Sequence, residues 1–197
     1  MNHIKLKQAA IIISFILHPM IVAPVMFSIL IYTDQSIQNA NHLFITSFLF
    51  STFFPVATIF FFKKKNLISD LEVSIREQRI QPLVFGTIYF AIGFILLRLQ
   101  NATPLIQGIM FCYAINTAIV WFITRIWKIS IHAIGLGGPL VALWLNGFNH
   151  PIIMGLLLFL VCSARVIMDA HTPAQVILGA ILAIVLAYFE LTYLFIS

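Results

Sequence analysis

Long apolar stretches separated by short polar segments dominate the pattern of hydrophobic and polar positions along this chain. Seven of them reach or approach the length that spans a membrane: 9–32, 43–62, 83–99, 104–124, 130–147, 151–168 and 173–195. The pattern predicts an all-α, polytopic transmembrane helical bundle with six to seven membrane helices, folded as a single domain over residues 1–197. His18, Pro19 and Pro24 interrupt the first stretch and predict a kink there.

The composition is that of a membrane-embedded protein. Hydrophobic residues make up 61% of the chain and charged residues 9%, with a mean hydropathy of +1.05, whereas about a quarter of the residues in a soluble domain are charged. No cleavable signal peptide is expected, because the first apolar stretch is membrane-length and lacks a small-residue cleavage site. Cys112 and Cys162 lie within apolar stretches, which favours packing roles over a disulfide or a metal site.

The basic residues are distributed unequally between the two sides of the predicted bundle. Counting the crossings places ten of the eleven Lys and Arg on one side, and only Arg98 lies near the other. The excess remains when possible site residues are removed, because Lys5, Lys7 and Lys63–Lys65 are still on the first side. The positive-inside rule then predicts that this side faces the cytoplasm, in a bacterial inner membrane. The net charge of +5 therefore needs no nucleic-acid partner.

The most distinctive polar pattern is Ser163–Gly179, which reads SARVIMDAHTPAQVILG. Arg165 ends one apolar stretch and His171 precedes the next, so both are expected at the same membrane face, where unpaired polar groups are costly. Thr172 and Gln175 have the spacing of a capping box at the start of a helix. The free N–H groups and the dipole of that helix start favour an anion such as phosphate beside His171.

This stretch resembles the third signature of the type 2 phosphatidic acid phosphatase family, SRxxxxxHxxxD. The spacing from Arg165 to His171 matches that signature. Two positions differ, because Ala164 stands in place of the serine and Gln175 in place of the aspartate.

Two further segments resemble the other signatures of that family more loosely. Ser130, His132 and Ala133 match the Ser-x-His-Ala part of PSGHA, but its proline and glycine are missing. The segment 75–82, with Arg76 and Arg79 followed by Pro82, keeps the basic residues and the proline of KxxxxxxRP without its spacing. All three segments fall on the side of the bundle that carries the basic residues.

The resemblance implies a phosphatase mechanism that requires no metal and no other cofactor. His171 would attack phosphorus and form a phosphohistidine, His132 would protonate the leaving oxygen, and Gln175 would orient His171 in place of the aspartate. The phosphate would be bound by Arg165, Ser130 and Arg79, with Arg76 and Lys128 as additional candidates. The implied substrate is an amphiphilic phosphate among the membrane lipids, such as a phospholipid phosphomonoester or an isoprenyl phosphate or diphosphate.

Each of these assignments has a structural alternative. Arg76 and Arg79 could be interfacial arginines that contact lipid headgroups. Ser130 could serve only as an N-cap, His132 could be a satisfied core histidine, and Gln175 could serve only in the capping box. Four more histidines have no motif context: His3, His18, His42 and His150. Two rival functions also remain, a catalytically degenerate protein that binds lipid phosphate and a small membrane transporter.

Overall fold

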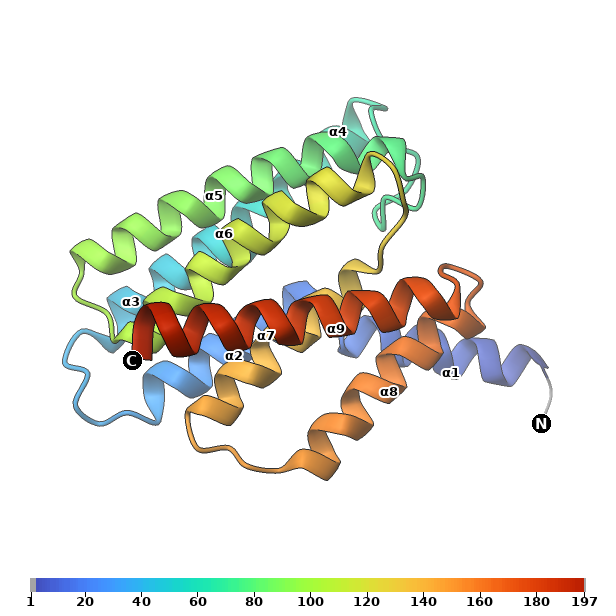
Figure 1. Cartoon of the computed structure of the whole chain (residues 1–197). Coiled ribbons are helices and arrows are strands. Elements are labelled where there is room, and N and C mark those ends of the chain that lie inside the picture. Colours follow the sequence, from blue (N-terminus) through green and yellow to red (C-terminus); the bar gives the residue numbers. More distant parts are fainter. Residues whose placement is uncertain (1–2, 197) are drawn as a thin grey trace.

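The structure is a computed structural model that describes residues 3–196, and it contains only helices as regular elements in that range (Figure 1). The predicted all-α fold is therefore confirmed. The α-helices are α1 (His3–Ile16), α2 (Pro19–Tyr32), α3 (Ala40–Phe48), α4 (Phe54–Lys64), α5 (Ile80–Leu99), α6 (Pro104–Thr124), α7 (Ile131–Leu145), α8 (Pro151–Ile167) and α9 (Pro173–Glu190). Two π-helical segments, Leu49–Phe53 and Leu191–Ile196, and a 3₁₀ turn, Glu77–Arg79, adjoin them.

Four helical stretches are long and apolar enough to cross a membrane: Ala40–Lys64, Glu77–Leu99, Pro104–Thr124 and Pro173–Ile196. The bent pair of α1 and α2 makes a fifth if it counts as one span. The expected six to seven membrane helices are therefore not confirmed. Helices α7 and α8 are the reason, because they have only 15 and 17 residues. At about 1.5 Å per residue they are shorter than a hydrocarbon core of roughly 30 Å.

The first apolar stretch breaks between α1 and α2, which are bent by 43° relative to each other. His18 is the N-cap of α2, because its Nδ1 accepts a hydrogen bond of 3.2 Å from the backbone N–H of Met20. Pro19 follows as the first residue of α2, where its missing N–H costs nothing. The predicted kink is confirmed and lies at His18, whereas Pro24 stays inside α2.

A glycine on α7 lets this break pack closely against the bundle. A Cβ at Gly135 would lie only 2.6 Å from Cγ of Pro19, so no other residue fits there without displacement. Gly135 comes one helical turn after His132, which places the start of α2 beside the start of α7.

Proline also explains the π-helical segment between α3 and α4. Pro55 has no backbone N–H, and in a regular α-helix its ring would clash with the carbonyl of Ser51. The chain instead widens from Leu49 to Phe53, and the N–H of Phe54 bonds to the carbonyl of Leu49. Ser51 and Pro55 both line the cavity described below.

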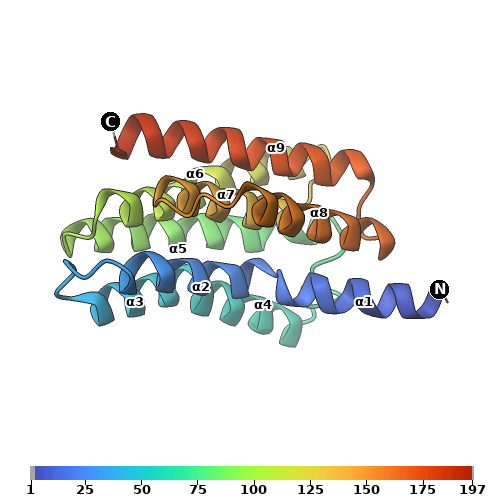
Figure 2. The same cartoon turned by 90° about the horizontal axis from the view of Figure 1, so that it is seen from below.

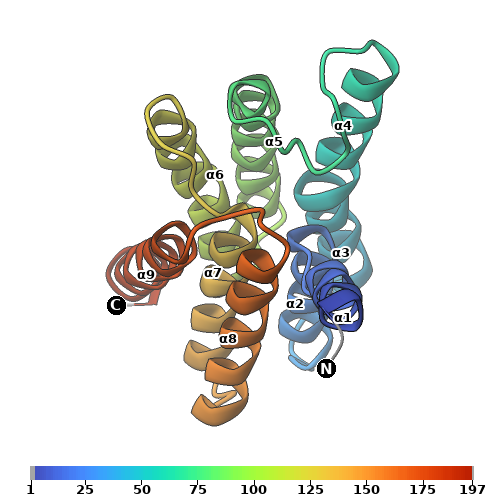
Figure 3. The ribbon, with the colours of Figure 1, turned by 90° about the vertical axis from the view of Figure 1, so that its right-hand side faces the viewer.

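The helices run roughly between two ends of an elongated bundle (Figures 1 and 2). The α4–α5, α6–α7 and α8–α9 connections lie at the end where α1 protrudes, and Figure 3 views the molecule from that end. The α2–α3 and α5–α6 connections and the C-terminus lie at the opposite end (Figure 1). The connections that share an end are the ones that counting the apolar stretches along the sequence places on the same side. This grouping brings the three motif-bearing segments to one end of the molecule.

Candidate functional site

One cavity of about 200 Å³ opens among α2, α5, α6 and α7 at the end that carries the motif-bearing segments. Four of the predicted site residues line it, namely Arg79, His132, Arg165 and His171. A histidine and a glutamate without a predicted role, His18 and Glu72, line it as well. The structure thus brings both candidate catalytic histidines and two arginines to a single cavity.

Arg165 is the most deeply buried cation of the site. It lies in the last turn of α8 with 2% of its surface exposed. Its Nη1 donates to Oγ of Ser14 at 2.8 Å and to Oε2 of Glu72 at 2.9 Å. Its Nε has no hydrogen-bond partner among residues 3–196. A buried donor without a partner is costly and indicates a place where a ligand can accept a hydrogen bond.

Arg79 is held by backbone carbonyls from two separate connections. It ends the 3₁₀ turn that precedes α5 and is 4% exposed. Its Nε donates to the carbonyl of Val73 at 2.7 Å, and its Nη1 donates to the carbonyl of Ile129 at 3.2 Å. Neither contact neutralises its charge, so the guanidinium contributes a positive potential to the cavity.

His171 and Gln175 contact each other across the first turn of α9. Nδ1 of His171 lies 2.9 Å from Oε1 of Gln175, and the same oxygen accepts a hydrogen bond of 3.2 Å from the backbone N–H of Thr172. Because Oε1 is an acceptor, Nδ1 must be the donor, which leaves the lone pair of the neutral ring on Nε2. The predicted capping box is confirmed, so Gln175 both caps α9 and sets the tautomer of His171.

The surroundings of His171 favour the neutral form of its imidazole ring. Burial lowers its pKa to about 4, the hydrogen bond that Nδ1 donates to Gln175 raises the pKa, and the charges of Arg79, Lys128 and Arg165 lower it further. A neutral ring with a free lone pair is the form that acts as a nucleophile.

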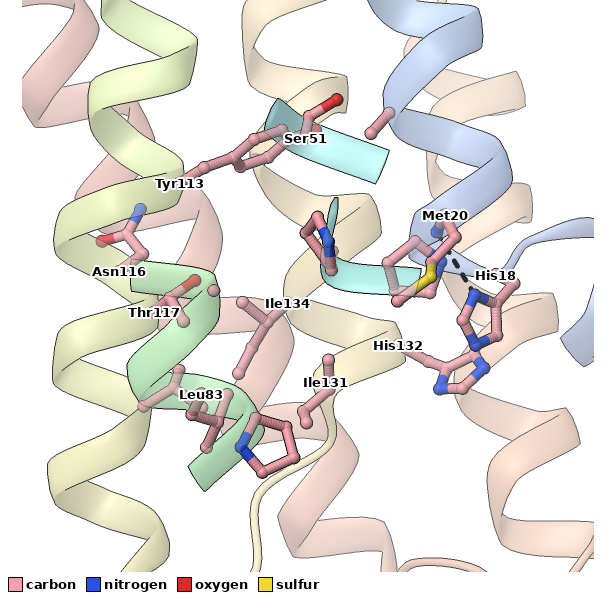
Figure 4. A pocket seen from close by; sticks show the side chains of 18 of the residues that line it. His18, Met20, Ser51, Leu83, Tyr113, Asn116, Thr117, Ile131, His132 and Ile134 are labelled. Atoms are coloured by element: carbon pink, nitrogen blue, oxygen red, sulfur yellow. Dashed lines mark hydrogen bonds between the residues drawn. The ribbon is translucent and has the colours of Figure 1, made fainter. Parts of the chain in front are cut away.

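His132 and His18 lie side by side in the cavity (Figure 4). Their ring centroids are 4.7 Å apart and the rings are nearly perpendicular. His132 is the second residue of α7 and is 6% exposed, and its Nε2 has no hydrogen-bond partner within the described part of the chain. This nitrogen is thus available to a ligand in the cavity.

His18 was missed by the motif comparison. The available signal was a histidine directly before a proline at the start of an apolar helix, a context similar to His171 followed by Thr172 and Pro173. Because Nδ1 of His18 accepts from Met20, the proton of its neutral ring lies on Nε2.

Three predicted phosphate-binding residues do not line the cavity, namely Ser130, Arg76 and Lys128. Ser130 is fully buried, and its Oγ accepts a hydrogen bond of 3.4 Å from the N–H of Ala133, as expected for an N-cap. Arg76 is paired with Glu77 at 2.8 Å and donates to the carbonyl of Ile126. These three residues therefore lie outside the lining that Arg79, His132, Arg165 and His171 share.

Lys128 nevertheless acts on the site through its charge. Burial lowers the pKa of its ammonium group, and the nearby guanidinium groups of Arg79 and Arg165 lower it further. A phosphate beside these arginines would relieve that repulsion and strengthen its own binding in the same step.

Away from these charged groups the cavity is mainly apolar. Its lining includes Leu83, Ile131 and Ile134 at one side and Tyr113 and Asn116 on α6 (Figure 4). The lining is suited to an apolar chain, and the charged end is suited to an anion. No group of three or more His, Cys, Asp and Glu side chains within the described residues could hold a metal ion.

Comparisons with known proteins add no relative, since no family model matches the chain and no curated protein or solved structure shows significant similarity to it.

Proposed function

We propose that this protein is a membrane-embedded phosphatase that hydrolyses an amphiphilic phosphate, such as a lipid phosphomonoester or an isoprenyl phosphate or diphosphate. The observation that carries the proposal is His171, a buried neutral imidazole with its lone pair on Nε2, in one cavity with the buried cations Arg79 and Arg165. The resemblance of the surrounding segments to the type 2 phosphatidic acid phosphatase signatures supports the same reading.

Substrate binding follows from the division of the cavity into a charged end and an apolar interior. The phosphate would accept hydrogen bonds from Nε of Arg165 and from the guanidinium of Arg79, while the apolar tail would lie along Leu83 and Ile134. Guanidinium groups suit phosphate oxygens because they present several donors in a fixed fork. Preorganised donors in a site with little water also stabilise the charge that shifts during phosphoryl transfer.

In the first chemical step Nε2 of His171 attacks phosphorus while the bond to the leaving oxygen breaks. The leaving oxygen takes a proton from His132, whose Nε2 has no partner among residues 3–196. Burial and the charge of Arg165 lower the pKa of His132, and a bound dianionic phosphate would oppose this and favour the protonated imidazole that the step requires. In the second step His132 takes a proton from water, the water oxygen attacks phosphorus, and inorganic phosphate leaves with His171 restored.

The site is proposed to face the cytoplasm of a bacterial inner membrane. The proposal follows from Lys63–Lys65, which lie at the C-terminal end of α4, at the same end of the bundle as the cavity, and are not among the residues that line it.

A lipid-phosphate-binding protein without hydrolytic activity is the second candidate. It is favoured by Gln175, which supplies the hydrogen bond to His171 without the negative charge that would stabilise the ring as it becomes positive.

The test is release of inorganic phosphate from a panel of lipid and isoprenyl phosphates by the purified protein in detergent. We expect release by the wild type, loss by about 10³-fold or more in His171→Gln, and loss of about 100-fold in Arg165→Lys. His150→Gln is the matched control, because His150 is exposed and lies outside the cavity. Binding without release supports the second candidate, and neither binding nor release by the wild type contradicts both.

A further inference from the structure

Arg165, the proposed phosphate-binding cation, already has an anion beside it. Oε2 of Glu72 lies 2.9 Å from its Nη1. The two partners differ in exposure, because 3% of the Arg165 side chain is accessible against 43% of the Glu72 side chain. The arginine is thus fixed within the bundle, whereas the carboxylate reaches in from the α4–α5 connection and can leave toward solvent.

The next residue of that connection holds the second arginine. The carbonyl of Val73 accepts the hydrogen bond from Nε of Arg79 at 2.7 Å. Val73 has φ = 48°, in the left-handed region that is disfavoured for a β-branched residue. Its side chain is nevertheless buried, packed with Phe62 and Ile68. The consecutive residues Glu72 and Val73 therefore each accept a hydrogen bond from one of the two arginines. Val73 does so in a strained backbone conformation, and such conformations are typical of functional segments.

We propose that Glu72 is an internal competing anion that a substrate must displace from Arg165, and that it makes the site select dianionic phosphates over phosphodiesters. The proposal rests on the proposed function, because it names the class of phosphate that the site accepts. Glu72 is here a specificity residue, with no part in the transfer of the phosphoryl group.

The selectivity follows from the charges of the competitors. A phosphodiester headgroup carries one negative charge, the same as the carboxylate it would have to replace. A phosphomonoester carries close to two at neutral pH, and a terminal diphosphate carries at least as many. Arg79, Arg165 and Lys128 all act on the same space. The positive potential therefore attracts a dianionic phosphomonoester more strongly than it attracts the Glu72 carboxylate. It does not attract a monoanionic phosphodiester more strongly than that carboxylate.

Competition from Glu72 for Arg165 is useful because of the location of the site. An arginine pair at the level of the headgroups attracts anionic phospholipids, and most of these are phosphodiesters. Without a resident anion the cavity would fill with the abundant lipids of the membrane. Glu72 and Val73 are adjacent in the α4–α5 connection, so we expect displacement of Glu72 to move this connection as well.

The test compares two lipids with the same short acyl chains, phosphatidic acid as the phosphomonoester and phosphatidylglycerol as the phosphodiester. Binding of radiolabelled phosphatidic acid to purified protein in detergent is measured with increasing phosphatidylglycerol, in chains that all carry His171→Gln so that the lipid is not hydrolysed. With the wild-type residue at position 72 we expect weak competition, and for Glu72→Gln we expect phosphatidylglycerol to compete at a concentration on the order of ten-fold lower. Glutamine keeps an acceptor for Arg165 and removes only the charge. Glu77→Gln is the control, because Glu77 pairs with Arg76 outside the cavity.

A second measurement does not depend on a substitution of Glu72. Ile68→Cys places a thiol at a site that is 3% exposed beneath the α4–α5 connection, in a chain whose Cys112 and Cys162 are replaced by alanine. We expect phosphatidic acid to speed its reaction with a maleimide, and phosphatidylglycerol to leave the rate unchanged.

The outcomes separate this inference from the proposed function. Equal competition with the wild-type residue at position 72 and in Glu72→Gln, with phosphatidic acid bound by both, overturns the role of Glu72 and leaves the phosphatase proposal standing. Equal acceleration of labelling by both lipids overturns it as well. Absence of phosphatidic acid and isoprenyl phosphate binding in every variant overturns the proposed function and this inference with it.

Discussion

Gln175 accepts a hydrogen bond from His171 and from the first turn of its own helix with the same oxygen, Oε1. The two roles that the sequence left as alternatives, helix cap and orienting group, are thus combined in one side chain. This has a structural consequence, because any change at Gln175 that alters the cap also changes the position of the ring.

Replacing Gln175 separates the effects of orientation and charge. Gln175→Glu keeps the length and the acceptor and adds a negative charge beside the ring, so we expect turnover of a lipid phosphate to rise at least ten-fold. Gln175→Ala removes the acceptor, and we expect turnover to fall at least ten-fold, with a loss of about 1 kcal/mol in stability from the cap. Steady-state phosphate release and thermal unfolding measure the two effects. Equal turnover in all three proteins would show that Gln175 is only a cap.

The low pKa of His171 predicts how activity responds to acid. With a pKa of about 4, lowered first by burial, the ring stays neutral and nucleophilic throughout pH 5–8, so His171 itself places no limit on turnover there. In Gln175→Glu the added carboxylate raises this pKa, and the acid limit of the pH–rate profile should move to higher pH. An unmoved acid limit in that variant contradicts the assignment of His171 as the nucleophile.

The same group predicts a stability window. The pKa of His171 is lowered on folding from its ordinary value of 6.5 to about 4, so between these values the unfolded state binds the additional proton. Stability therefore increases as pH rises through this window and is lost as pH falls from about 6.5 to 4. We expect the melting temperature in detergent to fall less between pH 7 and pH 5 in His171→Gln than in the wild type. A steeper fall in the variant would contradict the burial of a neutral ring.

Gly135→Ala tests whether the approach of the α1–α2 break to α7 supports the site. The added Cβ would lie 2.6 Å from Pro19, which must move and carry His18 away from His132. We expect a destabilisation of about 1–3 kcal/mol from overpacking and a fall in turnover. Gly155→Ala is the control, since nothing lies within 4 Å of a Cβ there. It should be neutral or slightly stabilising, because alanine is the better helix former.

Single cysteines test which side of the membrane carries the site. Lys64→Cys and Gln38→Cys lie at opposite ends of the bundle in exposed positions, each in a chain whose Cys112 and Cys162 are replaced. In intact cells we expect a membrane-impermeant maleimide to label the cysteine at position 38 and to leave the one at position 64 unmodified. The reverse pattern would place the cavity on the outer face.

The helices themselves were predictable, because apolar stretches of this length have few alternatives. The number of membrane helices was not, since hydropathy does not show that α7 and α8 have only 15 and 17 residues. Arg165, His171 and Gln175 were found because they lie within one short segment whose spacing is informative. For Ser130 the sequence left two roles open, because an N-cap and a phosphate ligand have the same residue preferences, and the structure shows the N-cap.

Glu72 and His18 could not be identified from the sequence in the same way. Each acts through a partner far away in the chain, Glu72 through Arg165 and His18 through His132. Such contacts depend on how the connections fold over the end of the bundle. The spacing of residues along the sequence does not predict this.

The pairing of Ser14 with Arg165 joins residues separated by 151 positions in the chain. At a synthesis rate of about 5–20 residues per second, roughly 8–30 s pass between the two leaving the ribosome. His171 follows later still, so α1 and α2 are made long before the groups they meet. A chain that is arrested before residue 165 therefore lacks both Arg165 and His171, and under the proposed function it would have no phosphatase activity on the lipids around it.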